Sequence, residues 1–222
     1  MSRGERVTLL VGSPKGLEAG SSVRLGRTIT DVLEEAGWHC GAFHLHAAVR
    51  TEGLMSELLD SIDSTDVVVL STPLYVDSLP APVIRALHRI AAHRNGTDGG
   101  NIPRFLSIVN CGFVEPWQND GAQRMLEQFC AEARFESVGA LSLGAGGAMT
   151  GKVQKAFKLA AEALRGDILI PVDVRKLTRS RIIPAWLYIL GGNMMWKKQA
   201  KANGVRNQLK AQPYKRAQSS CT

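Results

Sequence analysis

The sequence is poor in cysteine, and the cysteines that it has show no paired spacing. Cys40, Cys111, Cys130 and Cys221 lie far apart, and no C-x-x-C occurs. This excludes the disulfide framework of small secreted domains and the usual spacings of zinc ribbons and iron–sulfur clusters. The set is typical of free thiols in a reducing compartment.

Long hydrophobic runs are also missing. The run Val7–Val11 near the N-terminus is too short for the apolar core of a signal peptide, and no small-residue cleavage site follows it. The apolar stretch at 182–190 has nine residues, whereas a helix needs about 20 to cross a bilayer. We therefore expect a cytoplasmic protein with no membrane span.

Acidic residues are almost absent from the end of the chain. Residues 171–222 hold eleven Lys and Arg but a single acid, Asp173, which gives this segment a net charge of +10. Residues 1–170 carry a net charge of −3, so the +7 of the whole chain belongs to an appendage. In the appendage, aromatic and basic residues are segregated rather than interleaved, which does not favour nucleic-acid binding.

The body of the chain alternates between two kinds of hydrophobic pattern. Strand-like runs occur at 7–11, 42–46, 66–70, 105–109 and 138–143, and helical spacing occurs at 22–36, 53–62, 82–93, 121–133 and 150–164. This alternation predicts an α/β fold: a five-stranded parallel sheet with helices on both faces. We expect a domain at 1–170, followed by a helical, basic extension at 171–222.

In such a sheet, ligands bind outside the carboxyl ends of the strands. The loop after the first strand reads Gly12-Ser-Pro-Lys and ends at Ser21-Ser22 before a helix. Small residues, hydroxyl donors, the charge of Lys15 and a helix N-terminus together suit a phosphate group. The pattern is neither G-x-G-x-x-G nor a Walker A motif. The alternative is a flexible loop with an ordinary helix cap.

The loop after the third strand, residues 71–82, is stiffened by prolines. It presents Leu74, Tyr75 and Val76 where a loop is normally polar, so it suits a flat aromatic ligand. The alternative is that Tyr75 packs on a neighbouring helix or subunit.

The loop after the fourth strand is Asn110-Cys-Gly-Phe-Val-Glu115. Gly112 would permit close backbone approach, and Phe113 could stack on a ligand. A structural turn is the alternative. Cys111 is either a redox thiol or, as we favour, a buried inert cysteine.

These three loops together resemble the flavodoxin-fold NAD(P)H-dependent FMN reductase family over residues 5–165, with Thr72-Pro-Leu-Tyr75 and Pro80-Ala-Pro82 as the most specific part. The resemblance implies a sheet order of 2-1-3-4-5 and non-covalent FMN. It implies that Ser13, Lys15, Ser21 and Ser22 hold the phosphate with Val23 among the cofactor-binding residues, that Pro73, Leu74, Tyr75 and Val76 line the isoalloxazine, and that Cys111, Gly112 and Phe113 close its other side. Lys15 stands where many relatives carry Arg, and the extension at 171–222 lies outside the match.

The function implied by this resemblance is that of an FMN-dependent NAD(P)H oxidoreductase, which passes electrons to a flavin, a quinone or another small acceptor. No residue is expected to act as a catalytic acid or base, because the cofactor supplies the reactive atoms. The alternative is an electron-carrier or partner-binding flavoprotein with little turnover of its own. The resemblance also leads us to expect a homodimer or higher homo-oligomer.

Two further patterns are weaker. Cys40, His44 and His46 would share one face of a strand and so imitate a metal site. We expect no metal there, because an edge strand commonly exposes polar residues. The stretch Gly146–Val153 nearly spells a Walker A motif but has Val153 where a hydroxyl must meet magnesium.

The extension combines Trp186, Tyr188 and Trp196 with Lys197, Lys198 and Lys201. One interpretation is an interfacial helix on an anionic membrane. The interpretation that we favour from the sequence is that residues 182–196 pack against the body or a neighbouring subunit, since apolar patches usually mark interfaces.

Overall fold

The computed structural model describes residues 5–96, 101–181 and 183–212. The chain forms two compact units, residues 1–182 and 183–222. Residues 171–182, which the sequence analysis assigned to the extension, group with the first unit. Cys221 and the last basic residues, Lys215 and Arg216, fall outside the described residues.

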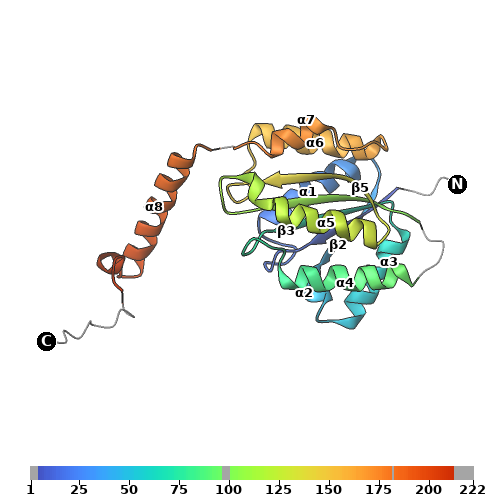
Figure 1. Ribbon diagram of the computed structural model, residues 1–222, viewed down its shortest axis with the longest axis horizontal. Coiled ribbons are helices and arrows are strands. Elements are labelled where there is room, and N and C mark those ends of the chain that lie inside the picture. Colours follow the sequence, from blue (N-terminus) through green and yellow to red (C-terminus); the bar gives the residue numbers. More distant parts are fainter. Residues whose placement is uncertain (1–4, 97–100, 182, 213–222) are drawn as a thin grey trace. The chain divides into compact units, whose positions relative to one another are not determined.

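The first unit contains a sheet of five parallel strands in the order β2-β1-β3-β4-β5 (Figure 1). Their bounds are β1 Arg6–Val11, β2 His39–His44, β3 Val67–Pro73, β4 Arg104–Asn110 and β5 Glu136–Leu143. All seven residues of the central strand β3 are buried, which explains the continuous apolar run Val67–Leu70. The predicted fold class and sheet order are confirmed.

Helices cover both faces of this sheet (Figure 1). Their bounds are α1 Ser21–Glu35, α2 Leu45–Ala48, α3 Glu52–Ser64, α4 Ala81–Asn95, α5 Asp120–Glu132, α6 Gly151–Arg165 and α7 Val172–Thr178, with a short 3-10 turn, η1, at Pro116–Asn119. One core lies between the sheet and the apolar sides of α1 and α6. A second core lies between the opposite face and α3, α4 and α5.

The second strand begins and ends earlier than its sequence pattern predicts. It pairs with β1 residue for residue, from Arg6 opposite His39 to Val11 opposite His44. Because β1 ends at Val11, the ladder ends at His44, and His46 falls in the short helix α2. The expectation that Cys40, His44 and His46 share one strand face is therefore wrong.

The connection to α7 belongs to the first unit. The backbone N–H of Ile170 donates to the carbonyl of Val138 in β5, and Val174 of α7 joins the core that α6 lines. The apolar sequence from Ile170 onward thus covers part of the outer side of the edge strand β5, which would otherwise expose unpaired backbone groups.

The second unit consists of α8, Ala185–Ala202, and a short 3-10 turn, η2, at Arg206–Gln208. Ala200 is the residue of α8 that is buried, so the large apolar side chains of this helix are exposed within their unit. Among the described residues, no helix is long and apolar enough to cross a membrane.

Candidate functional site

The carboxyl ends of the strands are joined by backbone hydrogen bonds beyond the sheet itself. The N–H of Gly12 donates to Ser71 (2.9 Å), and the N–H of Leu74 donates to Asn110 (2.8 Å). A side chain on Gly12 would collide with Thr72, so only glycine permits this approach of the two loops. The loops after β1, β3 and β4 therefore meet at one edge of the sheet, as the sequence predicted.

The start of α1 offers uncapped backbone donors. Its N-cap is Gly20, at φ 111°, which makes no side-chain cap, and the first turn holds no acidic residue. A Cβ built on Gly20 would lie 3.5 Å from Ser13 Oγ and 3.5 Å from Lys15 Cδ. A hydroxyl, a lysine side chain and free N–H groups with the positive end of a helix dipole are thus gathered around one small space, which suits an anion.

Two residues of this loop are turned away from that space. The hydroxyl of Ser22 donates to Asn110 Oδ1 (3.0 Å), and the hydroxyl of Ser71 donates to the carbonyl of Ser22 (2.7 Å). Val23 is buried in the core. Ser22 and Val23 therefore offer an anion only their backbone N–H groups, whereas the side chains of Ser13, Lys15 and Ser21 remain near the helix start.

The loop after β3 contains a tight turn in which Tyr75 and Ser78 exchange backbone hydrogen bonds of 2.9 and 3.1 Å. Val76 and Asp77 occupy its centre at φ 50° and 57°. This left-handed conformation is unfavourable for a β-branched residue such as valine. Val76 is 99% exposed and Tyr75 48% exposed, while Pro73 and Leu74 are buried. The turn thus holds apolar surface out at the edge of the sheet.

The loop after β4 presents Gly112 and Phe113 to solvent, with Phe113 52% exposed. Cys111 behind them is buried, and its Sγ lies 3.7 and 3.6 Å from the carbonyl oxygens of Phe113 and Glu115. Burial raises the pKa of the Cys111 thiol. This environment supports the inert interpretation of Cys111, since a reactive cysteine needs a lowered pKa and access.

Glu115, an acid in this loop, is held by an ion pair rather than left to solvent. Its Oε1 lies 3.0 Å from the guanidinium of Arg181, and that guanidinium lies 4.8 Å from the ring centre of Trp117. Arg181 follows α7, so the end of the first unit reaches back to the loop after β4.

The loop after β5 closes against the same region. The N–H of Gly146 donates to Cys111 (2.8 Å), the N–H of Ala145 donates to Phe113, and Arg24 donates to the carbonyl of Gly147 (3.1 Å). Gly147 lies so close to Ser21, Leu25 and Asn110 that a Cβ would contact all three. Residues 144–147 therefore form a tight strand-to-helix loop next to the start of α1.

Two histidines support the loop after β1, a role that sequence reasoning missed. His44 Nε2 lies 2.8 Å from the carbonyl oxygen of Ser13, and His46 Nε2 lies 3.1 Å from that of Gly12. Because a carbonyl only accepts, each Nε2 carries the proton. The rings stack in parallel with centroids 5.4 Å apart. The available signal was that parallel strands β1 and β2 end side by side, which brings His44 next to the first loop.

The environment of His46 disfavours its charged form. Burial lowers the pKa of this imidazole, and the nearby His44 and Arg50 lower it further, against the hydrogen bond to Gly12. Among the described residues, no group of three or more His, Cys, Asp or Glu could hold a metal ion.

The sheet order, the helices on both faces and the joined loops at the carboxyl edge define a flavodoxin-like α/β fold. Three solved structures illustrate the likeness. An FMN-dependent NADH-azoreductase from Bacillus anthracis has a TM-score of 0.56 and 15% identity, with 72% of this chain and 99% of that chain covered. An NAD(P)H:quinone oxidoreductase from Methanothermobacter marburgensis has a TM-score of 0.55 and 16% identity, with 72% and 96% covered.

A WrbA-like flavodoxin from Agrobacterium tumefaciens has a TM-score of 0.57 and 11% identity, with 74% of this chain and 97% of that chain covered. At such identities the likeness is one of fold. No protein-family model matches the sequence, and no curated protein matches it.

Proposed function

We propose that the protein is a cytoplasmic, FMN-dependent oxidoreductase that takes electrons from NADH or NADPH and passes them to a small acceptor such as a flavin or a quinone. One observation carries the proposal. A loop built for an anion, at the start of α1, lies at the same sheet edge as the exposed apolar surfaces of Tyr75, Val76 and Phe113. FMN has a matching group for each: a phosphate for the anion-binding loop and a flat aromatic ring for the apolar surface.

The chain's residues suit the two ends of this cofactor. The first N–H groups of α1, the hydroxyls of Ser13 and Ser21 and the charge of Lys15 would bind the phosphate. Tyr75, Val76 and Phe113 would pack on the ring, with backbone groups near Gly112 at its polar edge. When bound, FMN supplies hydride and electron transfer, so the protein's part is to bind, orient and exclude water.

The structural neighbours support the acceptor class. They include proteins described as an NADH-azoreductase, an NAD(P)H:quinone oxidoreductase and an NADH:FMN oxidoreductase. A homodimer or higher homo-oligomer belongs to the same proposal, because it rests on the same family resemblance. Light scattering on the purified protein measures the mass that tests it.

Cofactor binding is tested by titrating the flavin-free protein with FMN and with riboflavin, which lacks the phosphate. We expect FMN to bind more tightly by at least about tenfold, because charge-assisted hydrogen bonds contribute about 1.5–3 kcal/mol each. Lys15→Gln should weaken FMN but not riboflavin. Lys152→Gln, an exposed lysine at the start of α6, is the matched control. Equal binding of the two flavins, or binding of neither, would contradict the proposal.

Turnover separates the oxidoreductase from an electron carrier. The FMN-loaded protein is mixed with NADH or NADPH and with a quinone, free flavin or azo dye, and nucleotide oxidation is followed by absorbance. Sustained oxidation that depends on the acceptor is expected. A protein that binds FMN but oxidises neither nucleotide would instead be the carrier of the alternative interpretation.

A further inference from the structure

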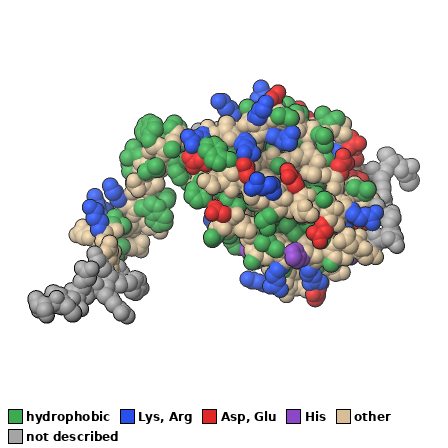
Figure 2. All heavy atoms as spheres, in the orientation of Figure 1, with side chains coloured by type: hydrophobic (Ala, Val, Ile, Leu, Met, Phe, Trp, Pro, Cys, Tyr) green, Lys and Arg blue, Asp and Glu red, His purple; other side chains and the backbone are tan. Residues whose placement is uncertain are grey.

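Helix α8 exposes an unusual amount of apolar surface. In its unit, Trp186 is 68% exposed and Trp196 60% exposed, and the side chains of Leu187, Ile189, Leu190, Met194 and Met195 are exposed as well. Figure 2 shows hydrophobic side chains gathered along the first part of this helix and lysines beyond them. Among the described residues of the second unit, the only other element is the short turn η2, which leaves these side chains exposed.

The apolar side chains point to every side of the helix. Successive residues of an α-helix turn by about 100°, so the unbroken run Trp186–Leu190 surrounds the axis. A helix that is apolar all round is not stable with its side chains in water, so α8 needs a further surface to cover at least part of it.

The charges next to the apolar residues of α8 indicate which kind of surface binds this helix. Lys197 and Lys198 directly follow Trp196, Lys201 lies one turn further on, and the sequence contains no acidic residue after Asp173. Trp186 begins the first apolar segment of the helix and Trp196 ends the second, Met194–Trp196, and tryptophan favours the boundary between headgroups and acyl chains. Lysines beside such a run can place their stems on apolar surface while their ammonium groups meet lipid phosphates.

We propose that α8 is a binding element for the surface of an anionic lipid bilayer, in which it lies at the interface. It does not span the bilayer, since the described helices include none that could. The proposal goes beyond the function proposed above and needs neither FMN nor turnover. It differs from the subunit packing favoured by the sequence alone, because the lysines next to the apolar residues and the lack of acidic residues after Asp173 fit an anionic lipid surface.

The helix itself is poorly suited to water. Gly191 and Gly192 lie in its middle, with nothing within 4 Å of where a Cβ would be, and each glycine lowers helix stability by about 1 kcal/mol relative to alanine. Most of the stability of helices in proteins comes from packing of an apolar face, and the second unit buries little of α8. Binding to lipid should therefore raise the helical content of the protein, a result independent of the binding measurement.

The experiment mixes the purified full chain with vesicles of phosphatidylglycerol and phosphatidylcholine, or of phosphatidylcholine alone, and separates bound protein by flotation. We expect flotation with anionic vesicles, weaker flotation with neutral ones, and a rise in helical circular dichroism on binding. The triple variant Lys197→Gln, Lys198→Gln, Lys201→Gln should lower the partition coefficient at least about tenfold, since each lysine near an anionic surface contributes about 1 kcal/mol.

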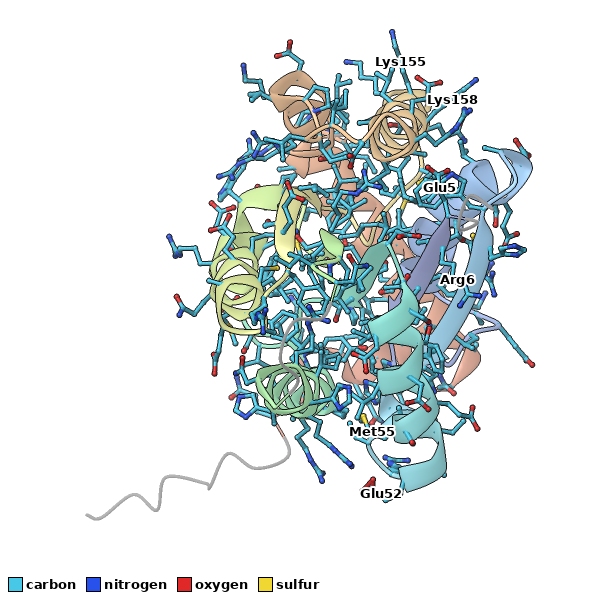
Figure 3. All side chains as sticks on the ribbon, turned by 90° about the vertical axis from the view of Figure 1, so that its right-hand side faces the viewer. Glu5, Arg6, Glu52, Met55, Lys155 and Lys158 are labelled. Atoms are coloured by element: carbon cyan, nitrogen blue, oxygen red, sulfur yellow. The ribbon has the colours of Figure 1, made fainter. Side chains whose placement is uncertain are left out.

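A matched control removes the same charge elsewhere. Lys152, Lys155 and Lys158 lie on the exposed side of α6, and Lys155 and Lys158 point outward from it (Figure 3). Their triple change to Gln should leave flotation unchanged. A second pair compares Leu190→Glu in α8, which should abolish flotation, with Ile102→Glu at another exposed apolar position, which should not.

Three results would overturn the proposal. The first is a failure to float with anionic vesicles. The second is a control variant of the three α6 lysines that lowers the partition coefficient as much as the variant of the three α8 lysines. The third is a lipid-free oligomer in which Trp186 and Trp196 are shielded from a fluorescence quencher, since that would show α8 covered by a second copy of the chain.

Discussion

At the scale of single residues, the turn after β3 places a valine of the proposed site in a backbone conformation that valine disfavours. Val76 occupies the left-handed region at φ 50° with its side chain 99% exposed. Nothing in the core requires a valine there. Strained residues of this kind gather at ligand sites, which agrees with the proposal that Val76 packs on the ring of FMN.

Replacing Val76 therefore separates stability from binding. Val76→Gly should raise the free energy of unfolding by about 1 kcal/mol, because glycine adopts a positive φ without a Cβ clash. It should also weaken FMN binding, because apolar surface is lost. Val76→Ala keeps the Cβ and removes the branch, so its free energy of unfolding should rise less than that of Val76→Gly. Urea unfolding measures the stabilities, and equal stability of the two variants would show that strain is not the cause.

His46 provides a pH-dependent contribution at the same scale. Burial lowers its pKa below the ordinary value of 6.5 in the folded protein, so the unfolded chain takes up the proton first as pH falls. The free energy of unfolding should therefore decrease as pH drops through 6.5 and below, and the stability contribution is fully present above that pH.

The His46→Gln variant should show a shallower decline between about pH 7.5 and 5.5, measured by urea unfolding at several pH values. Glutamine can still donate to the carbonyl of Gly12, so the loop keeps its support. His88→Gln, an exposed histidine on α4, controls for the loss of a histidine as such. If the free energy of unfolding fell equally with pH in the wild type and in His46→Gln, the pH dependence would not come from His46.

At the scale of elements, Arg94 links the end of α4 by hydrogen bonds to the connections that precede β4 and β5. Its guanidinium, in a side chain that is only 5% exposed, donates to the carbonyls of Ala133 (2.7 Å), Asn101 (2.8 Å) and Arg134 (3.0 Å). It also lies 4.5 Å from the ring centre of Phe135. One side chain thus joins α4 to the connections before β4 and β5, and burial lowers the pKa of its guanidinium.

Arg94→Met should lower the free energy of unfolding by about 2–4 kcal/mol, because three carbonyls lose a buried charged donor. Arg89→Met, on the exposed side of the same helix, removes an ion pair with Glu52 and should change stability little. Chemical denaturation compares the two. If both variants lost similar amounts of free energy of unfolding, the loss would come from replacing an arginine in α4 and not from the three carbonyls that Arg94 binds.

The positions of the five strands and of α1, α3, α4, α5 and α6 could be predicted from the sequence within a few residues, because their apolar spacing is regular, whereas the short helices α2 and α7 were not predicted. The main error was at β2. Its end is set by pairing with β1, and pairing partners are not visible in a single strand's pattern. The same error hid the contacts of His44 and His46 with the loop after β1.

At the scale of the whole molecule, charge and apolar surface are divided between two units. The first buries its hydrophobic residues on both faces of the sheet, whereas the second exposes them on a helix followed by basic residues. The vesicle experiment addresses the second unit and the flavin titration addresses the first. The two proposals can therefore fail separately.

The sequence by itself determined the sheet, its flanking helices and the composition of the loops, because burial periodicity and loop chemistry are local properties of a chain. Only the tertiary structure decided which loop side chains face the same space. Ser22 and Val23 turn inward, Val76 is held outward in a strained turn, and two histidines support the phosphate-type loop. Such orientations depend on contacts between residues far apart in the chain, and these form only when the strands have been brought into register.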